Sequence, residues 1–168
     1  NATASGTRAL AQIVRARGVD VRQVDRLAQS RIGDPATTTV VIAEPGWLTA
    51  GQLRSLADYP GDLVLVGSSA EALEALDIPA EERVVGLPET AQAGCDDPDA
   101  VAAGEVRVEG WGLAATGDDA VLCFAQRGDV AAFARVERDG RTITVIAATD
   151  IVTNGALDRL GHAALAVR

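Results

Sequence analysis

The sequence predicts an α/β protein, namely a three-layer, doubly wound and mainly parallel sheet with an antiparallel β extension in its second half. Strand-like segments alternate with helix-like segments up to residue 88, which is typical of parallel sheets with helical crossovers. Beyond residue 88, strand-like segments follow one another without a helix, which is typical of antiparallel ribbons. The chain has 168 residues, enough for one domain with a substantial core.

We expect one domain over residues 3–168, preceded by Asn1 and Ala2, which resemble a remnant of an expression vector. The chain contains no Met, even at position 1, so we expect it to be a piece of a longer protein. The domain divides into a parallel α/β part at about 5–88, an antiparallel extension at about 104–147 and a C-terminal helix at about 155–167.

Four elements are predicted before residue 44. Apolar residues at helical spacing predict an amphipathic helix over Ser5–Arg17, ended by Gly18, because glycine readily adopts the left-handed turn that follows a helix. Alternating valines predict a strand over Val19–Val24, and a short helix follows over Asp25–Ser30. The β-branched run Thr37–Ala43 predicts a strand buried on both faces.

Two capping boxes then mark helix starts, because a Ser or Thr followed three residues later by Glu or Gln can satisfy the free amides of the first turn. The boxes are Thr49-x-x-Gln52, opening a helix through Asp58, and Ser68-x-x-Glu71, opening a helix to about Asp77. A buried strand at Asp62–Val66 and a further short strand at Arg83–Leu87 accompany these helices.

The second half is predicted to begin with a loop over Thr90–Gly104, which is rich in Ala, Asp and Gly. Asp139-Gly140 lies between two strand-like runs and therefore predicts a tight hairpin turn. The predicted strands are Glu105–Trp111, Ala120–Gln126, Ala131–Arg138 and Arg141–Ala147.

Composition excludes several classes of function. The net charge of −9 repels phosphate backbones and anionic membrane surfaces, so we expect no binding to nucleic acid. No apolar run reaches the roughly 18–20 residues that a membrane span needs. The chain also lacks the glycine patterns of nucleotide-binding loops, and we therefore expect no cofactor.

The two cysteines, Cys95 and Cys123, allow more than one interpretation. A structural zinc site lacks ligands, because the chain has one His and no CxxC spacing, so we expect no metal there. Two separate buried thiols fit the residues, because free Cys behaves as a small apolar side chain. A disulfide that ties the Gly/Asp-rich loop to a strand also fits and would indicate an oxidising compartment.

Weak candidates for ligand binding follow the predicted strands, at the edge where doubly wound sheets bind their ligands. Backbone amides at a helix start could accept an anion there, although capping is the commoner role of such residues. These candidates are Glu44, Ser68, Ser69, Thr153 and Asn154.

A catalytic site is not expected. An amidotransferase needs a Cys nucleophile at a strand-to-helix elbow, and Gly67-Ser68-Ser69 offers serines without the second glycine of a nucleophile elbow. His162 is the sole His, and its place in an apolar helical segment predicts packing more than catalysis. A Ser-dependent hydrolase or transferase that uses Ser68 or Ser69 with His162 is the rival hypothesis.

Two further features have simple interpretations. Asp96-Asp97-x-Asp99 superficially resembles a calcium loop, but it lacks the remaining ligands of an EF-hand, so we expect a solvated loop. Trp47 and Trp111 are the largest aromatic residues, and each could fill the core or anchor a partner.

Five segments, in order along nearly the whole chain, resemble the actinobacterial membrane-protein domain-of-unknown-function family 4350. The segments are SGTRALAQIVRARGVDVRQV, WLTAGQLRSLADYPGDLVLVG, GCDDPDAVAAGEVRV, AVLCFA and TVIAATDIVTNGALDRLGHAALAVR. The resemblance implies a class I glutamine-amidotransferase-like, flavodoxin-type fold. His162 departs from the family pattern, which tends to have Asn there.

The resemblance also implies a domain outside the cytoplasm, held between two transmembrane helices that are not in this sequence, with Cys95 and Cys123 paired. It further implies partners in the cell envelope, such as a MoxR-type ATPase and a von Willebrand A-like protein. Together with the lack of a catalytic set, this favours a non-catalytic binding, scaffolding or sensor domain of a membrane protein. A small-ligand-binding domain that uses the strand ends is the alternative.

Overall fold

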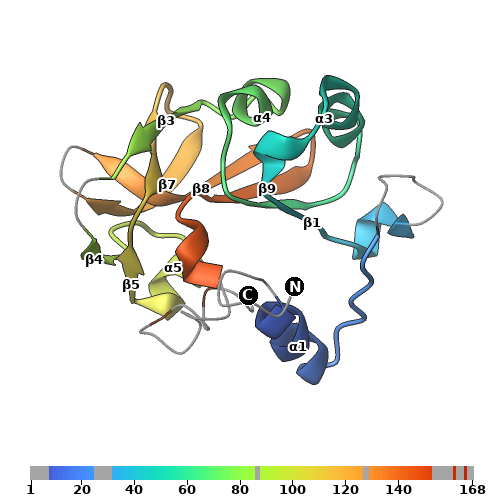
Figure 1. The fold of residues 1–168 in the computed structure, drawn as a ribbon, viewed down its shortest axis with the longest axis horizontal. Coiled ribbons are helices and arrows are strands. Elements are labelled where there is room, and N and C mark those ends of the chain that lie inside the picture. The colour runs from blue at the N-terminus through green and yellow to red at the C-terminus, as the bar shows by residue number, and fades with distance from the viewer. Residues whose placement is uncertain are drawn as a thin grey trace.

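The structure is a computed structural model that describes residues 8–24, 32–85, 88–126, 129–152, 161 and 165. Within these ranges a seven-stranded sheet has the order β1-β2-β9-β8-β6-β3, with β7 paired to β8, and β4 and β5 form a small second sheet (Figure 1). The strands are β1 (Val40–Ala43), β2 (Leu63–Val66), β3 (Ala80–Val84), β4 (Glu89–Gln92), β5 (Glu105–Val108), β6 (Trp111–Ala115), β7 (Ala120–Gln126), β8 (Val130–Arg138) and β9 (Arg141–Ile146).

Helices lie above and below the large sheet in Figure 1, with α3 and α4 on one side and α1 and α5 on the other. The helices are α1 (Arg8–Ala16), α3 (Ala50–Ala57), α4 (Ala70–Ala75) and α5 (Pro98–Ala103), and the 3-10 helices are η1 (Pro35–Thr37), η2 (Pro45–Trp47) and η3 (Thr149–Val152). In the described part of the chain, no helix combines the length and apolarity needed to cross a membrane.

The sheet is mixed, so the expectation of a mainly parallel sheet is wrong. Strands β1, β2 and β9 run parallel, with Val40 beside Leu63 and Leu63 beside Ile143. The other four pairings among its described strands are antiparallel. The predicted antiparallel extension therefore does not stand apart, because its last strand, β9, supplies the third parallel strand.

The core has two parts, one on each face of the sheet. Under α3 and α4, Leu56 and Leu73 pack on Leu63, Leu65 and neighbouring strand residues. On the opposite face the aromatic pair Phe124 and Phe133 meets edge to face at 6.4 Å. Burying each large apolar side chain contributes roughly 1.5–3 kcal/mol, so both clusters hold the sheet to its helices.

The predicted capping boxes have different outcomes. Thr49 and Gln52 form a reciprocal box at the start of α3, as predicted. The Ser68-x-x-Glu71 box is wrong, because Ser69 caps α4 by accepting a hydrogen bond from the Ala72 amide at 3.1 Å. Ser68 instead donates to Glu82 Oε1 at 2.8 Å.

Two predicted strands of the first half need correction. Val19–Val24 is irregular, with Val19 and Val24 exposed and no strand partner among the described residues. The strand predicted over Thr37–Ala43 starts only at Val40, because Asp34 and Pro35 open a 3-10 turn through Thr37. It lies at the edge of the sheet with Val41 55% exposed, so it is not buried on both faces.

In the middle of the chain, the boundaries of the elements also differ from the predicted ones. The strand predicted over Arg83–Leu87 runs over Ala80–Val84, and residues 86–87 lie outside the described ranges. The loop predicted over Thr90–Gly104 contains most of β4 and all of α5. The strand predicted over Glu105–Trp111 is divided between β5 and β6 at Gly110, whose φ of +87° breaks the extended backbone.

The last hairpin agrees closely with the sequence prediction. Strands β7, β8 and β9 match the predicted segments to within one residue. Asp139 and Gly140 have φ values of +51° and +78°, as a two-residue hairpin turn requires. The predicted helices at 25–30 and 155–167 fall on residues that are outside the described ranges, except for 161 and 165.

Candidate functional site

The face of the sheet opposite α3 and α4 is only partly covered, and we call it the α1 face. One row of neighbours crosses five strands on it, because side chains alternate between the two faces of a strand. The row consists of Val41, Val64, Thr144, Arg135 and Val121. Its two ends are open, since Val41 is 55% exposed and Val121 is 46% exposed.

A cavity of about 430 Å³ lies between α1 and this face, and we call it the α1 cavity. Helix α1 contributes Leu10, Ala11 and Val14, which are only half-buried. Closely packed protein interiors contain few voids larger than a water molecule. The remaining wall comes from Val21, Thr39, Val41, Asp62, Leu63, Val64, Val66, Asp99, Phe133, Arg135, Thr142, Thr144, Ile146, Val152 and Leu165.

The wall of the cavity changes from apolar to polar along the strands. At the carboxyl ends of β2 and β9 it is formed by Val66 and Ile146. At their amino ends it is formed by Asp62 and Thr142, where the Thr142 amide donates to Asp62 Oδ1 at 2.8 Å. The Thr142 hydroxyl donates to Glu137 Oε1 at 3.0 Å, so carboxylates gather at this end.

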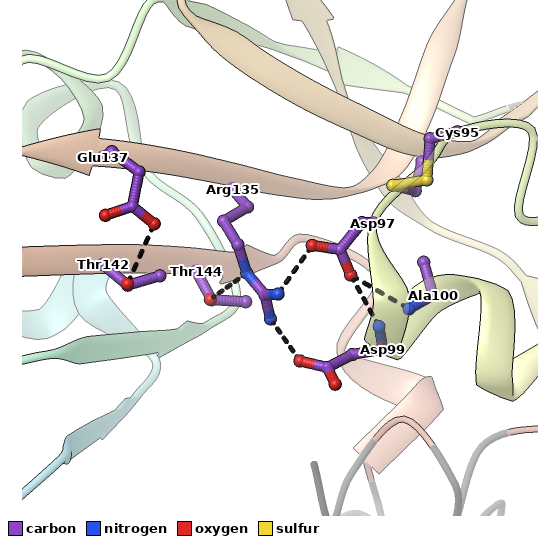
Figure 2. Close-up of polar contacts among 9 residues, drawn as sticks. Cys95, Asp97, Asp99, Ala100, Arg135, Glu137, Thr142 and Thr144 are labelled. Carbon is purple, nitrogen blue, oxygen red and sulfur yellow. Dashed lines mark hydrogen bonds and ion pairs between the residues drawn. A yellow bond between two sulfur atoms is a disulfide. The ribbon is translucent and has the colours of Figure 1, made fainter.

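An ion-pair cluster forms another side of the cavity. The Arg135 guanidinium donates to Asp97 Oδ2 at 2.6 Å, to Asp99 Oδ2 at 2.8 Å and to Thr144 Oγ1 at 3.3 Å (Figure 2). It also lies 5.3 Å from the centre of the Phe133 ring, within the range of a cation–π contact. The two carboxylate contacts join β8 to the start of α5, and the Thr144 contact joins β8 to β9.

Asp97 has two roles in this cluster and is only 6% exposed. Its Oδ1 accepts the amides of Asp99 and Ala100 and so caps α5, while Oδ2 accepts Arg135. The expectation of a solvated acidic loop is therefore wrong for Asp97 and Asp99. The Asp97-Pro98 pair, a common start of a helix, was the sequence signal that could have revealed the cap; no sequence signal indicated Arg135.

Cys95 and Cys123 are joined by a disulfide, with their Cα atoms 5.4 Å apart. The bond connects the segment before α5 to β7, and Figure 2 shows it beside Asp97. Neither sulfur is therefore available as a nucleophile in this state.

The predicted ligand-binding residues at the strand ends are only partly brought together. Glu44 is exposed in a left-handed conformation with φ of +57°. At these strand ends the chain segments lie close together at Gly67, where an added Cβ would lie 3.3 Å from Thr149 Cγ2 and 3.4 Å from Pro45 Cδ. Ser68 and Ser69 bond to Glu82 and to the start of α4, as described above.

Thr153, Asn154 and His162 lie outside the described residues. The strand-end site and the rival serine hydrolase consequently stay predictions. Trp47 is 87% exposed beyond the end of β1, and Trp111 is half-exposed beside Val84, so neither fills the core.

These observations define a mixed α/β domain with a partly polar cavity under an amphipathic helix. The chain belongs to the family described as Domain of unknown function (DUF4350), whose model matches residues 1–168. The family resemblance expected from the sequence is thereby confirmed.

Among particular proteins, the chain is similar to the "Uncharacterized membrane protein Rv3691" of Mycobacterium tuberculosis, with 33% identity over 170 residues. The match covers 98% of this chain, which spans 42% of the length of that relative. The relative is thus a membrane protein, and this chain corresponds to less than half of it.

Among solved structures, the chain is similar to the mmIFT52 N-terminal domain, with a TM-score of 0.66 and 15% sequence identity. The likeness covers 95% of this chain and 86% of that one. At this identity it describes the fold alone. The amidotransferase-like, flavodoxin-type arrangement that the resemblance implied is supported by neither comparison.

Proposed function

We propose that this domain is a non-catalytic binding module of a membrane protein and that the α1 cavity is its binding site. The cavity carries the proposal, because its volume lies within the range of about 300–1,000 Å³ that ligand sites occupy. Its walls also resemble such sites, since most of the lining residues are apolar and only a few are polar.

The state of the candidate nucleophiles supports a role without catalysis. The two sulfurs are bonded to each other, Ser69 accepts a hydrogen bond from a helix amide, and Ser68 donates a hydrogen bond to Glu82. A Ser nucleophile needs a base within hydrogen-bond reach, and His162, the base of the rival hypothesis, lies outside the described residues. The proposal therefore rests on the partners that the serines and sulfurs already have.

The disulfide supports a location outside the cytoplasm, because such bonds persist in oxidising compartments. There the domain would bind, scaffold or sense on behalf of the longer protein. Partners in the cell envelope, such as a MoxR-type ATPase or a von Willebrand A-like protein, are part of this proposal through the family resemblance alone.

The experiment is a titration with the neutral hydrophobic dye Nile red. Val64→Phe places a larger side chain in the middle of the cavity, whereas Val121→Phe makes the same change in the same row, outside the cavity. We expect the wild type and Val121→Phe to bind the dye alike and Val64→Phe to bind at least about tenfold more weakly. Equal binding by both variants would refute the proposal, provided that both unfold cooperatively.

A further inference from the structure

We infer that the α1 cavity binds single-chain amphiphiles whose head group is cationic or neutral and donates hydrogen bonds, such as a long-chain amine or alcohol. It binds these more tightly than amphiphiles with a carboxylate head group. This inference rests on the proposed binding function and adds the chemical class of the ligand. It follows from the shape of the cavity, from the position of polar residues at its Asp62 end and from the charges at that end.

The shape of the cavity suits an unbranched chain. From Asp62 to Val66 the strand rises about 13 Å, at about 3.3 Å per residue. From Val64 onward β2 itself contributes only valines to the wall, while Thr144 and Arg135 border the cavity beside Val64. Val152 and Leu165 line the same cavity and extend this apolar part. A flexible hydrocarbon chain can fill such a space, whereas water would find few hydrogen-bond partners there.

The polar end of the cavity faces solvent. Asp62 and Thr39 are exposed, while Leu63 and Val66 on the same sheet are buried. An amphiphile can therefore bury its tail along β2 and β9 and leave its head in water beside Asp62. A ligand that is polar throughout would lose its hydration along the apolar wall without replacement.

The charges at this end favour a ligand head group that donates hydrogen bonds. Asp62 Oδ1 accepts the Thr142 amide, and Oδ2 receives no hydrogen bond from the described residues. The positive charge of Arg135 is directed at Asp97 and Asp99, which together outnumber it. A carboxylate head would thus meet net negative charge, and an ammonium or hydroxyl would meet acceptors.

Two arginines of α1 and the segment after it, Arg15 and Arg22, have partners away from Asp62. Arg15 donates to the Val21 carbonyl at 2.9 Å, and Arg22 pairs with Asp20 at 2.8 Å. Neither guanidinium is bonded to Asp62. Among the contacts of the described residues, Asp62 Oδ2 is thus left as an acceptor for an incoming head group.

The test compares decylamine, 1-decanol and decanoate as competitors of Nile red at pH 7 and low salt. We expect decylamine to bind about tenfold more tightly than decanoate, because one exposed charge attracts the amine and repels the acid. Added salt should shrink the ratio, since exposed charges are screened. Asp62→Asn keeps an oxygen for the Thr142 amide but removes the charge, and it should lower the ratio of decylamine to decanoate affinity to about twofold.

The outcomes separate this inference from the function on which it rests. Suppose that Val64→Phe abolishes dye binding but that decanoate binds as tightly as decylamine, or that Asp62→Asn has no effect. Either result would refute the ligand class and leave the binding function intact. No competition by any of the three compounds would also refute the inference. If the dye itself does not bind, α1 fills the cavity in solution, and both proposals are wrong.

Discussion

At the scale of single residues, buried polar groups act as connectors between distant parts of the chain. Arg141 is 7% exposed, and its guanidinium donates to the carbonyls of Leu56, Ala57 and Tyr59 at the end of α3. The last carbonyls of a helix have no partner four residues on, although the Leu56 carbonyl also accepts the Tyr59 amide at 3.2 Å. A cation at this end also interacts favourably with the helix dipole. One side chain at the start of β9 thus holds α3 against the sheet.

Tyr59 is a second connector, and it predicts a pH dependence. Its hydroxyl donates to the Thr38 carbonyl at 2.9 Å, and its side chain is buried. Burial, followed by the nearby carboxylates of Asp62 and Asp34, raises the pKa of Tyr59 above its ordinary value of 10.0.

Because the pKa of Tyr59 is higher in the folded state than in the unfolded state, its contribution to stability is fully present below about pH 10. It is lost as the pH rises through the folded-state value. Tyr59 is the sole tyrosine, so the ultraviolet absorbance of tyrosinate reports this group alone. We expect a titration midpoint above 10 in the native protein, and a midpoint near 10 would contradict the structure.

At the scale of elements, α5 is a short helix that depends on contacts outside itself. It has six residues, too few for stability on its own, and Asp97 both caps it and pairs with Arg135 on β8. Asp99 pairs with the same guanidinium but is more exposed and caps nothing that the structure describes. The two carboxylates therefore form a matched pair for mutation.

Asp97→Ala should destabilise the domain by about 3 kcal/mol, because it removes the cap and leaves the partly buried Arg135 with half of its negative partners. Asp99→Ala should cost about 1 kcal/mol or less. Urea unfolding of both variants beside the wild type measures the difference. Similar midpoints for the two variants would show that Asp97 is not the main attachment of α5.

Local sequence patterns correctly predicted the elements whose structure depends on interactions within the motif itself. The Thr49 capping box and the Asp139-Gly140 hairpin were found because each motif carries its own hydrogen bonds or backbone preference. Val19–Val24 alternates like a strand but is irregular, since a strand also needs a neighbour, which alternation does not reveal. The Ser68 box failed for a similar reason, because Glu82, from another element, took its hydroxyl.

At the scale of the whole molecule, the candidate site could not have been predicted from the sequence. The α1 cavity combines residues from the first helix, the parallel strands and the last hairpin, and β9 reaches its place beside β2 from about 80 positions farther along the chain. The sequence predicted a site at the strand ends, by analogy with doubly wound sheets. That expectation came from the fold class, whereas the cavity depends on how loosely one helix lies on one face.

The disulfide is the covalent link on which this architecture depends. It joins the small β4–β5 sheet and α5, which form one wall of the second core, to β7 in the large sheet. The two cysteines are 28 positions apart. Closing a loop of that length lowers the entropy of the unfolded chain and so raises its free energy by about 3–4 kcal/mol. For a domain of this size, such a loss lowers the Tm by roughly 6–16 °C.

Reduction should therefore lower the Tm by an amount in that range, and the Cys95→Ala, Cys123→Ala double variant should match the reduced protein, with little further change on adding reductant. Mass spectrometry after treatment of the native, unreduced protein with a thiol-reactive tag should find no addition. Two additions would show free thiols, which would remove the support for an oxidising compartment and make Cys95 and Cys123 available for chemistry.

Because Cys95 is two residues before Asp97, reduction should also loosen the Arg135 cluster, which forms one wall of the α1 cavity. Nile red binding should therefore weaken before the domain unfolds.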